Sequence, residues 1–192
     1  MYLNTQKNHR HQTPQKSIKG SLKKSKLLAY QYYEEALSCS ENYQAASQLL
    51  NKAKKLILNA TSMNPIDAES FNLLSRIELE RGDKISALQA INNAVELEPN
   101  NGGYWYSAGH AHLALNQLPK AKFSFEKAIE IFPDETRAEI GLAYTFQELG
   151  EPVKAFQMFR EIVKVNPDDI QVRSLLLNSA TTIKADYYDQ TL

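Results

Sequence analysis

The residues that could carry catalytic or metal chemistry are few in this chain, which has four histidines and one cysteine among its 192 residues. His110 and His112 stand two positions apart in a helical segment, so they point to different faces and cannot chelate one metal ion. His9 and His11 have no carboxylate or cysteine ligand nearby in the sequence. Cys39 has no cysteine to pair with and no adjacent basic cluster to stabilise a thiolate. The sequence also lacks a glycine-rich phosphate loop and a nucleophile–base pair, so we expect no enzyme activity, no cofactor and no metal site.

Charge is distributed unevenly along the chain. Lysine and arginine number 22, and so do aspartate and glutamate, which makes the formal net charge zero. The residues before the first acid, Glu34, nevertheless include seven basic ones: Lys7, Arg10, Lys16, Lys19, Lys23, Lys24 and Lys26. The other 15 basic and all 22 acidic residues give the remainder a formal charge of −7. This segregation predicts a disordered basic tail over residues 1–21. Contact of the tail with nucleic acid, with an anionic membrane or with the chain's own acidic body stays open as an alternative.

The composition is that of a globular protein, with 43% hydrophobic and 23% charged residues. No stretch approaches the roughly 20 apolar residues that span a bilayer. The segment Met1 to Lys26 has no apolar core of a secretory signal. A single cysteine is typical of a reducing compartment, so we expect a cytoplasmic location.

Four columns of residues recur every 34 positions. The prolines are Pro65, Pro99, Pro133 and Pro167. The alanines are Ala53, Ala87, Ala121 and Ala155. A large apolar residue follows each alanine at Ile57, Ile91, Phe125 and Phe159, and a further apolar residue follows at Ala60, Ala94, Ala128 and Ile162. This spacing makes one helical stripe whose small residues let two helices approach closely. A constant period of this length indicates a helical repeat array.

Each period divides into two helices at a residue that tolerates the left-handed conformation, namely Gly82, Asn116 or Gly150. Because proline cannot continue a helix, each proline column ends a unit. The expected helix pairs run from about Asp67 to Glu98, from Asn101 to Phe132 and from Glu135 to Asn166.

The ends of the array depart from this plan. A first helix is expected from about Leu22 to Ser38, and its partner from about Glu41, with Ser40 as N-cap. That partner helix is roughly two turns longer than the period allows. After the last proline, a capping helix is expected from Asp168 to about Lys184. Its apolar stripe consists of Leu175, Leu176, Ala180 and Ile183.

The best single unit contains Trp105, Ala108, Gly109, His112, Ala121, Phe125, Ala128 and Pro133. This pattern closely resembles the tetratricopeptide repeat family, although Glu139 stands where that family places an aromatic residue. The resemblance implies an all-α fold, a right-handed superhelix of stacked antiparallel helix pairs. It would contain three regular repeats, an irregular N-terminal helix pair and a C-terminal capping helix. The expected domains are the basic tail 1–21, the repeat domain 22–184 and a C-terminal tail 185–192.

The resemblance also implies a concave groove that is lined by the first helix of each pair and binds a peptide or helix. The groove residues carried over to this chain are Asn72, Arg76, Tyr106, His110, Leu113, Arg137, Ile140, Tyr144 and Glu148. Arg76, Arg137 and His110 suit a carboxylate or phosphate, and the two tyrosines supply rigid contact area. The carboxylate clamp of chaperone-binding repeats is not present, because only Arg137 keeps its charge and Gly141 replaces an arginine.

We therefore expect a protein-interaction module, an adaptor, co-chaperone or assembly scaffold, whose partner is another protein and not a small-molecule substrate. The alternative is the N-terminal repeat region of a larger enzyme such as a methyltransferase or other transferase, because such arrays often precede transferase domains. The sequence leaves the partner's identity and the oligomeric state open.

Overall fold

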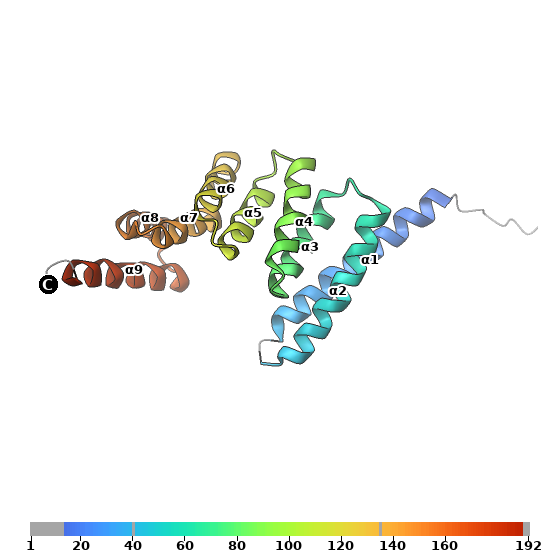
Figure 1. Ribbon diagram of the computed structural model, residues 1–192, viewed down its shortest axis with the longest axis horizontal. Helices are drawn as coiled ribbons and strands as arrows, with labels where there is room; N and C mark the ends of the chain where they lie inside the picture. Colours follow the sequence, from blue (N-terminus) through green and yellow to red (C-terminus); the bar gives the residue numbers. More distant parts are fainter. Residues whose placement is uncertain (1–13, 40, 135, 190–192) are drawn as a thin grey trace, which may run out of the picture. The chain divides into compact units, whose positions relative to one another are not determined.

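The computed structural model describes residues 14–39, 41–134 and 136–189, and every regular element within these ranges is an α-helix. The chain divides into two compact units, Met1–Pro65 and Ile66–Leu192. The first unit contains α1 (Pro14–Ser38) and α2 (Tyr43–Met63). The second contains α3 (Ala68–Glu80), α4 (Lys84–Leu97), α5 (Gly102–Ala114), α6 (Leu118–Ile131), α7 (Thr136–Glu148), α8 (Pro152–Val165) and α9 (Ile170–Asp189) (Figure 1).

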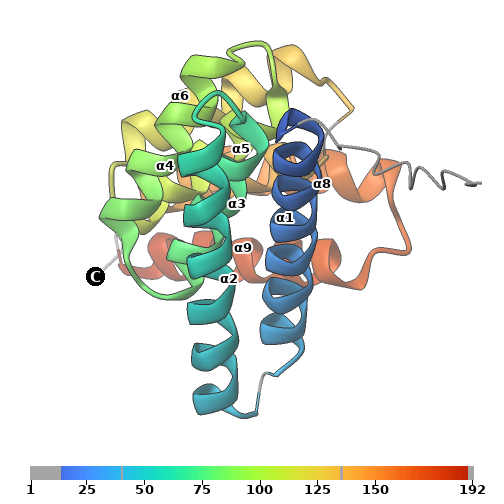
Figure 2. The same cartoon turned by 90° about the vertical axis from the view of Figure 1, so that its right-hand side faces the viewer.

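Helices α1 and α2 of the first unit lie side by side as an antiparallel pair (Figure 2). Their buried apolar residues recur at helical spacing, as Ala29, Tyr33 and Ala36 in α1 and as Leu50, Ala53, Ile57 and Ala60 in α2. Helix α2 has 21 residues, whereas α4, α6 and α8 have 14 each, so the prediction of a helix two turns longer is confirmed.

The helix boundaries at both ends of the chain differ from the expected ones. Helix α1 begins at Pro14 rather than near Leu22, because proline suits the first turn of a helix and the lysines that follow are good helix formers. The expected basic tail is thus helical from Pro14 onward, and residues 1–13 lie outside the described residues. At the other end, α9 continues to Asp189, past the expected end at Lys184.

The start of α2 also differs from the sequence expectation. The Asn42 side chain accepts a hydrogen bond from the Ala45 N–H at 3.0 Å and so caps the helix, which begins at Tyr43. The predicted cap, Ser40, lies outside the described residues.

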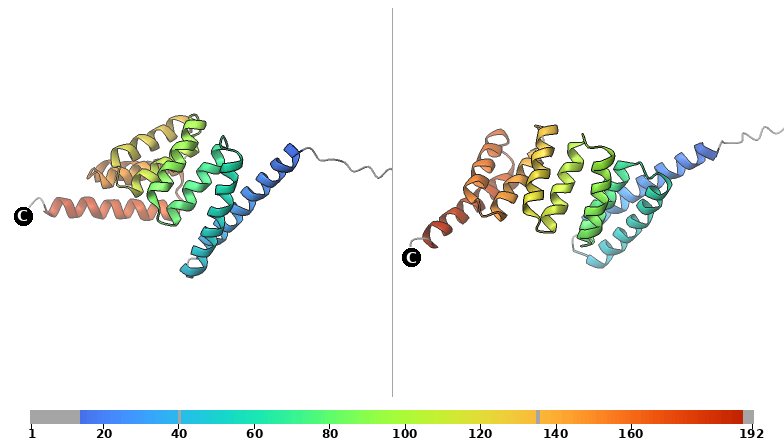
Figure 3. Two further views of the ribbon diagram at one scale, coloured as in Figure 1. Left: turned by 45° about the vertical axis from the view of Figure 1, so that its right-hand side comes forward. Right: turned by 45° about the horizontal axis from the view of Figure 1, so that its top comes forward.

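In the second unit, three helix pairs follow one another and α9 covers α8 (Figure 3). The turn within each pair contains a residue with positive φ: Gly82 at 80°, Asn116 at 55° and Gly150 at 74°. After each of these residues, a backbone N–H bonds back across the turn at 2.9 Å, from Asp83 to Glu78, from Gln117 to His112 and from Glu151 to Phe146. The predicted turn column is therefore confirmed, and one hydrogen-bonded helix ending is repeated three times.

The predicted core columns are buried. In the second unit Ala87, Ala121 and Ala155 are fully buried, as are Ile91, Phe125 and Phe159. Each second helix contacts the first helix of the next pair, and α5 also contacts both α3 and α7. Helices α3, α5 and α7, the first helices of the three pairs, therefore form one continuous face, the inner face. Helix α9 contributes Val172 to the core, with Leu175 and Leu176 packed against it.

Candidate functional site

The face formed by α5 and α7 is organised around one ring from α6. Phe125 is fully buried. A Cβ atom added at Gly109 of α5 would lie 2.6 Å from this ring, and one added at Gly141 of α7 would lie 2.5 Å from it. Both glycines therefore let Phe125 enter between the two helices. This close approach gives a packing reason for Gly141, the residue that replaces the clamp arginine.

Two of the predicted groove residues, Tyr106 and His110, lie around Phe125, and a third, Arg137, contacts Tyr106. The His110 ring lies 5.3 Å from the Phe125 ring, edge to face, and 4.6 Å from the Tyr106 ring. The guanidinium of Arg137, on α7, lies 5.4 Å from the centre of the Tyr106 ring, on α5. This cation–π contact joins neighbouring repeats. Because Arg137 is exposed and Tyr106 half-buried, the pair presents a cation beside an aromatic surface.

His110 is half-buried beside these rings. Burial lowers the pKa of its imidazole below the ordinary value of 6.5, so the ring is neutral at pH 7. Its Nε2 atom is shielded from solvent and has no hydrogen-bond partner among the described residues. A neutral, shielded ring is a poor ligand for an anion. The ring packs against Phe125 and Tyr106, and its burial does not favour the anion-binding role that the sequence predicts for it.

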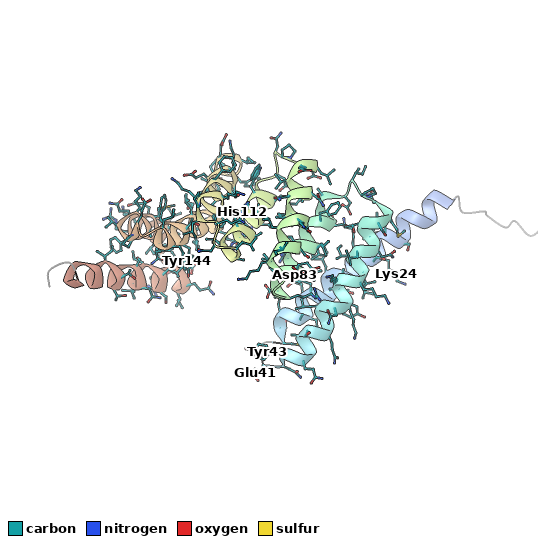
Figure 4. The ribbon with its side chains drawn as sticks, in the orientation of Figure 1. Lys24, Glu41, Tyr43, Asp83, His112 and Tyr144 are labelled. Atoms are coloured by element: carbon teal, nitrogen blue, oxygen red, sulfur yellow. The ribbon has the colours of Figure 1, made fainter. Side chains whose placement is uncertain are left out.

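The other predicted groove residues are more dispersed. Leu113 and Ile140 are half-buried against the core that contains Phe125. Tyr144, labelled on α7 in Figure 4, is 41% exposed, and its ring lies 5.9 Å from that of Phe159. Glu148 is exposed at the end of α7. These four residues extend the face along α5 and α7 without joining the Arg137–Tyr106 pair.

Helix α3 carries the remaining two groove residues. Arg76 and Asn72 are both half-buried there. The Asn72 Oδ1 atom is shielded from solvent and, like the His110 nitrogen, lacks a hydrogen-bond partner within the described ranges. Both residues lie on α3, which contacts α5, so they are one repeat away from Tyr106.

The residues considered for metal or catalytic chemistry are not brought together. His112 is held by Gln117, whose Oε1 lies 2.9 Å from its Nδ1, whereas His110 packs on rings. Cys39 is half-buried, and His9 and His11 lie outside the described residues. In the ranges that the structure describes, no three His, Cys, Asp or Glu side chains are grouped to hold a metal ion. No helix of those ranges is long and apolar enough to cross a membrane.

Sequence reasoning missed a hollow in the second unit. It is lined by one residue of α7, Glu139, and by five residues of α8, namely Gln157, Met158, Glu161, Ile162 and Val165. Its only signal in the sequence was the departure of Glu139 from the aromatic column. A further open hollow lies beside the start of α5, between Glu98, Gly103 and Phe132.

Comparison with known proteins agrees with this architecture. Residues 112–178 match the family model described as Tetratricopeptide repeat. Protein CTR9 homolog of Arabidopsis thaliana is 27% identical over 171 residues, which cover 83% of this chain and 16% of that protein. Human Tetratricopeptide repeat protein 33 is 26% identical over 161 residues, or 80% of this chain and 57% of that protein. Human Protein O-mannosyl-transferase TMTC3 is 29% identical over 109 residues, 56% of this chain and 12% of that protein. This chain spans less than two thirds of the length of each relative.

Solved structures show the same fold at low sequence identity. A structure of pilF from Pseudomonas aeruginosa superposes with a TM-score of 0.72 at 14% identity, covering 90% of this chain and 76% of that one. A structure of MamA superposes with a TM-score of 0.66 at 14% identity, covering 86% of this chain and 90% of that one. These likenesses confirm an all-α solenoid of stacked helix pairs.

Proposed function

Because this chain is a tetratricopeptide repeat protein, with the general protein-interaction role of that family, we propose that it holds a peptide segment or helix of a partner protein against the inner face of α3, α5 and α7. The observation that carries the proposal is the contact of the Arg137 guanidinium with the Tyr106 ring, which spans two repeats on that face. The proposed role is that of an adaptor, co-chaperone or assembly scaffold and involves no catalysis.

The chemistry of this pair favours a partner segment that carries both an acid and an apolar side chain. The ring orients the guanidinium, which binds a carboxylate or phosphate with two parallel hydrogen bonds. Half-buried Leu113 and Ile140 offer apolar surface nearby. Aromatic and arginine side chains of this kind are enriched among residues that dominate binding energy.

The test is affinity capture from a native extract, followed by binding measurements between the recovered partner and variants of this chain. Replacing Arg137 by alanine should weaken binding about tenfold or more, since a charge-assisted hydrogen bond contributes about 1.5–3 kcal/mol. Arg137→Lys should recover only part of the loss, because lysine keeps the charge without the planar fork. Arg173→Ala, which removes an exposed arginine on α9, is the matched control. Equal binding by Arg137→Ala and Arg173→Ala would exclude Arg137 as a contact.

A second candidate is that the repeats belong to a longer transferase. The observation that favours it is the likeness to TMTC3, a protein named as an O-mannosyl-transferase, of which this chain matches 12%. The length of the native protein decides the matter. A native chain that continues beyond residue 192 into a transferase domain supports this candidate, and a native chain of 192 residues excludes it.

A further inference from the structure

The first helices of the three regular repeats differ at one position of the 34-residue period. This position holds Phe71 in α3, Trp105 in α5 and Glu139 in α7. Trp105 shows what an aromatic residue does there: its ring packs edge to face against Phe123 of α6, with 5.8 Å between ring centres, and its Nε1 donates a hydrogen bond to the Pro99 carbonyl at 2.7 Å.

The third repeat has neither member of that aromatic pair. Glu139 replaces the tryptophan, and the position that corresponds to Phe123 holds Gln157. A hollow of about 270 Å³ lies between α7 and α8 at this place, and its apolar lining is Met158, Ile162 and Val165. Because small-molecule sites typically measure roughly 300–1,000 Å³, this hollow is suited to a single side chain.

The two carboxylates at the hollow differ in their pairing. Glu161 accepts hydrogen bonds from Lys164 at 2.7 and 2.8 Å and lies 3.5 Å from Arg160. Glu139 has no hydrogen-bond or ion-pair partner among the described residues. Partial burial raises the pKa of the Glu139 carboxyl above its ordinary value, which means that its ionised form is incompletely solvated. An incoming cation would compensate this charge.

We propose that the hollow between α7 and α8 receives one arginine side chain of a partner protein, with its methylene stem against Met158, Ile162 and Val165 and its guanidinium on the Glu139 carboxylate. The guanidinium matches a carboxylate with two parallel hydrogen bonds, and its stem covers apolar surface. The site is separate from the Arg137–Tyr106 pair, because Arg137 and Glu139 stand two positions apart on α7 and face different ways. The proposal rests on the proposed function only for assigning the side chain to a protein.

Methionine methyl resonances provide a direct readout, because the chain has only three methionines and Met158 lines the hollow. The experiment titrates the full chain, labelled with ¹³C at its methionine methyl groups, with N-acetyl-arginine amide. We expect a saturable shift of the Met158 signal, with half-saturation on the order of millimolar for so small a ligand. N-acetyl-lysine amide should bind more weakly, and the uncharged N-acetyl-norleucine amide should cause little shift.

Two isosteric variants make the test specific. Glu139→Gln should weaken binding of the arginine amide about tenfold, since a hydrogen bond to a charged group is lost. Glu126→Gln removes an exposed carboxylate of α6 and should leave the titration unchanged. The proposal is overturned if the Met158 signal does not move, if Glu139→Gln titrates like the unmodified chain, or if norleucine amide binds as well as arginine amide.

The proposal for the groove and the proposal for the hollow can be tested independently of each other. Arg137→Ala should leave the Met158 titration unchanged while it weakens partner binding. A Met158 titration that is lost in Arg137→Ala would contradict the independence of the two sites and overturn the assignment of this hollow. Loss of partner binding alone, with the titration intact in every Arg137 variant, supports both proposals.

Discussion

The burial of His110 depends on the Phe125 ring, which comes from another helix, α6. Its place on the first helix of a repeat was predictable from the sequence, because the resemblance assigns that position to the inner face. Its burial was not predictable, since it depends on how far the Phe125 ring enters at Gly109 and Gly141. Packing between side chains distant in sequence thus decides how deeply each of the predicted groove residues is buried, and it leaves Arg137 more exposed than His110.

The lowered pKa of His110 predicts an acid-sensitive fold. The unfolded chain binds a proton to this ring at the ordinary pKa of 6.5, and the folded chain binds it only at lower pH. The stability conferred by the neutral ring is therefore complete above that value and is lost as the pH falls below 6.5 towards the folded pKa. Denaturant unfolding between about pH 8 and pH 5 should show this loss, and His110→Phe should reduce it.

His112 titrates in the same direction, because burial also lowers its pKa, and it serves as the comparison. His112→Gln should remove a smaller part of the pH dependence, since this ring is less buried and its bond to Gln117 raises its pKa. A His110→Phe variant with the same pH dependence as the unmodified chain would contradict the assignment.

At the scale of the helices, most boundaries followed from residue types whose effects are local. Glycine, asparagine and proline columns placed the ends of α3 to α8 close to their observed positions, because these residues act through their own backbone geometry. The start of α1 differed most from the expected boundary. The basic residues before Leu22, with no acid among them, suggested a tail, whereas lysine is compatible with a helix and Pro14 suits its first turn.

Two glycines should respond in opposite ways to alanine. Gly150 has a φ of 74° and open space around it, so Gly150→Ala strains only the backbone and should lower the free energy of unfolding by about 1 kcal/mol. Gly20 lies within α1, also in open space. Gly20→Ala should therefore stabilise the chain by about 0.5–1 kcal/mol. Thermal unfolding followed by circular dichroism measures both, and a shift of the same sign in both variants would contradict this reading.

The entry of Phe125 between α5 and α7 predicts a rescue. Gly141→Ala places a methyl group 2.5 Å from the Phe125 ring, and overpacking of this kind should cost about 1–3 kcal/mol of stability. Phe125→Leu shortens the intruding side chain, so its own destabilisation should be smaller in a chain that already carries Gly141→Ala. Denaturant unfolding of the two single variants and the double variant tests this coupling, and strictly additive effects would be evidence against it.

At the scale of the whole chain, the period predicted the stack of helix pairs but not its division into two units. The core columns continue in register from Ala53, Ile57 and Ala60 into the later repeats, so nothing in their spacing marks a boundary at Pro65. The division depends on which helices contact each other, and a one-dimensional pattern does not contain that information. The hollow at Glu139 could not be predicted from the sequence for the same reason, because the residues of α8 line it only when α7 and α8 pack together.

The second unit should fold without the first. It contains three complete helix pairs and a covering helix, and stacks of this kind are stabilised by contacts between neighbouring repeats. A fragment of residues 66–192 is expected to show helical circular dichroism and one cooperative unfolding transition. A fragment that is largely unfolded at low denaturant would mean that α1 and α2 are needed for the stability of the remaining helices.

The three left-handed turn residues recur at equal spacing, and this regularity bears on how the chain can change its length. Removal or duplication of one complete 34-residue segment keeps every later alanine, proline and turn residue in phase with the helices before it. A deletion of one or two residues inside a helix instead rotates all later side chains of that helix by about 100° per residue. Tandem duplication and loss of whole segments are therefore the length changes that this architecture tolerates, and short insertions are best accommodated in the turns.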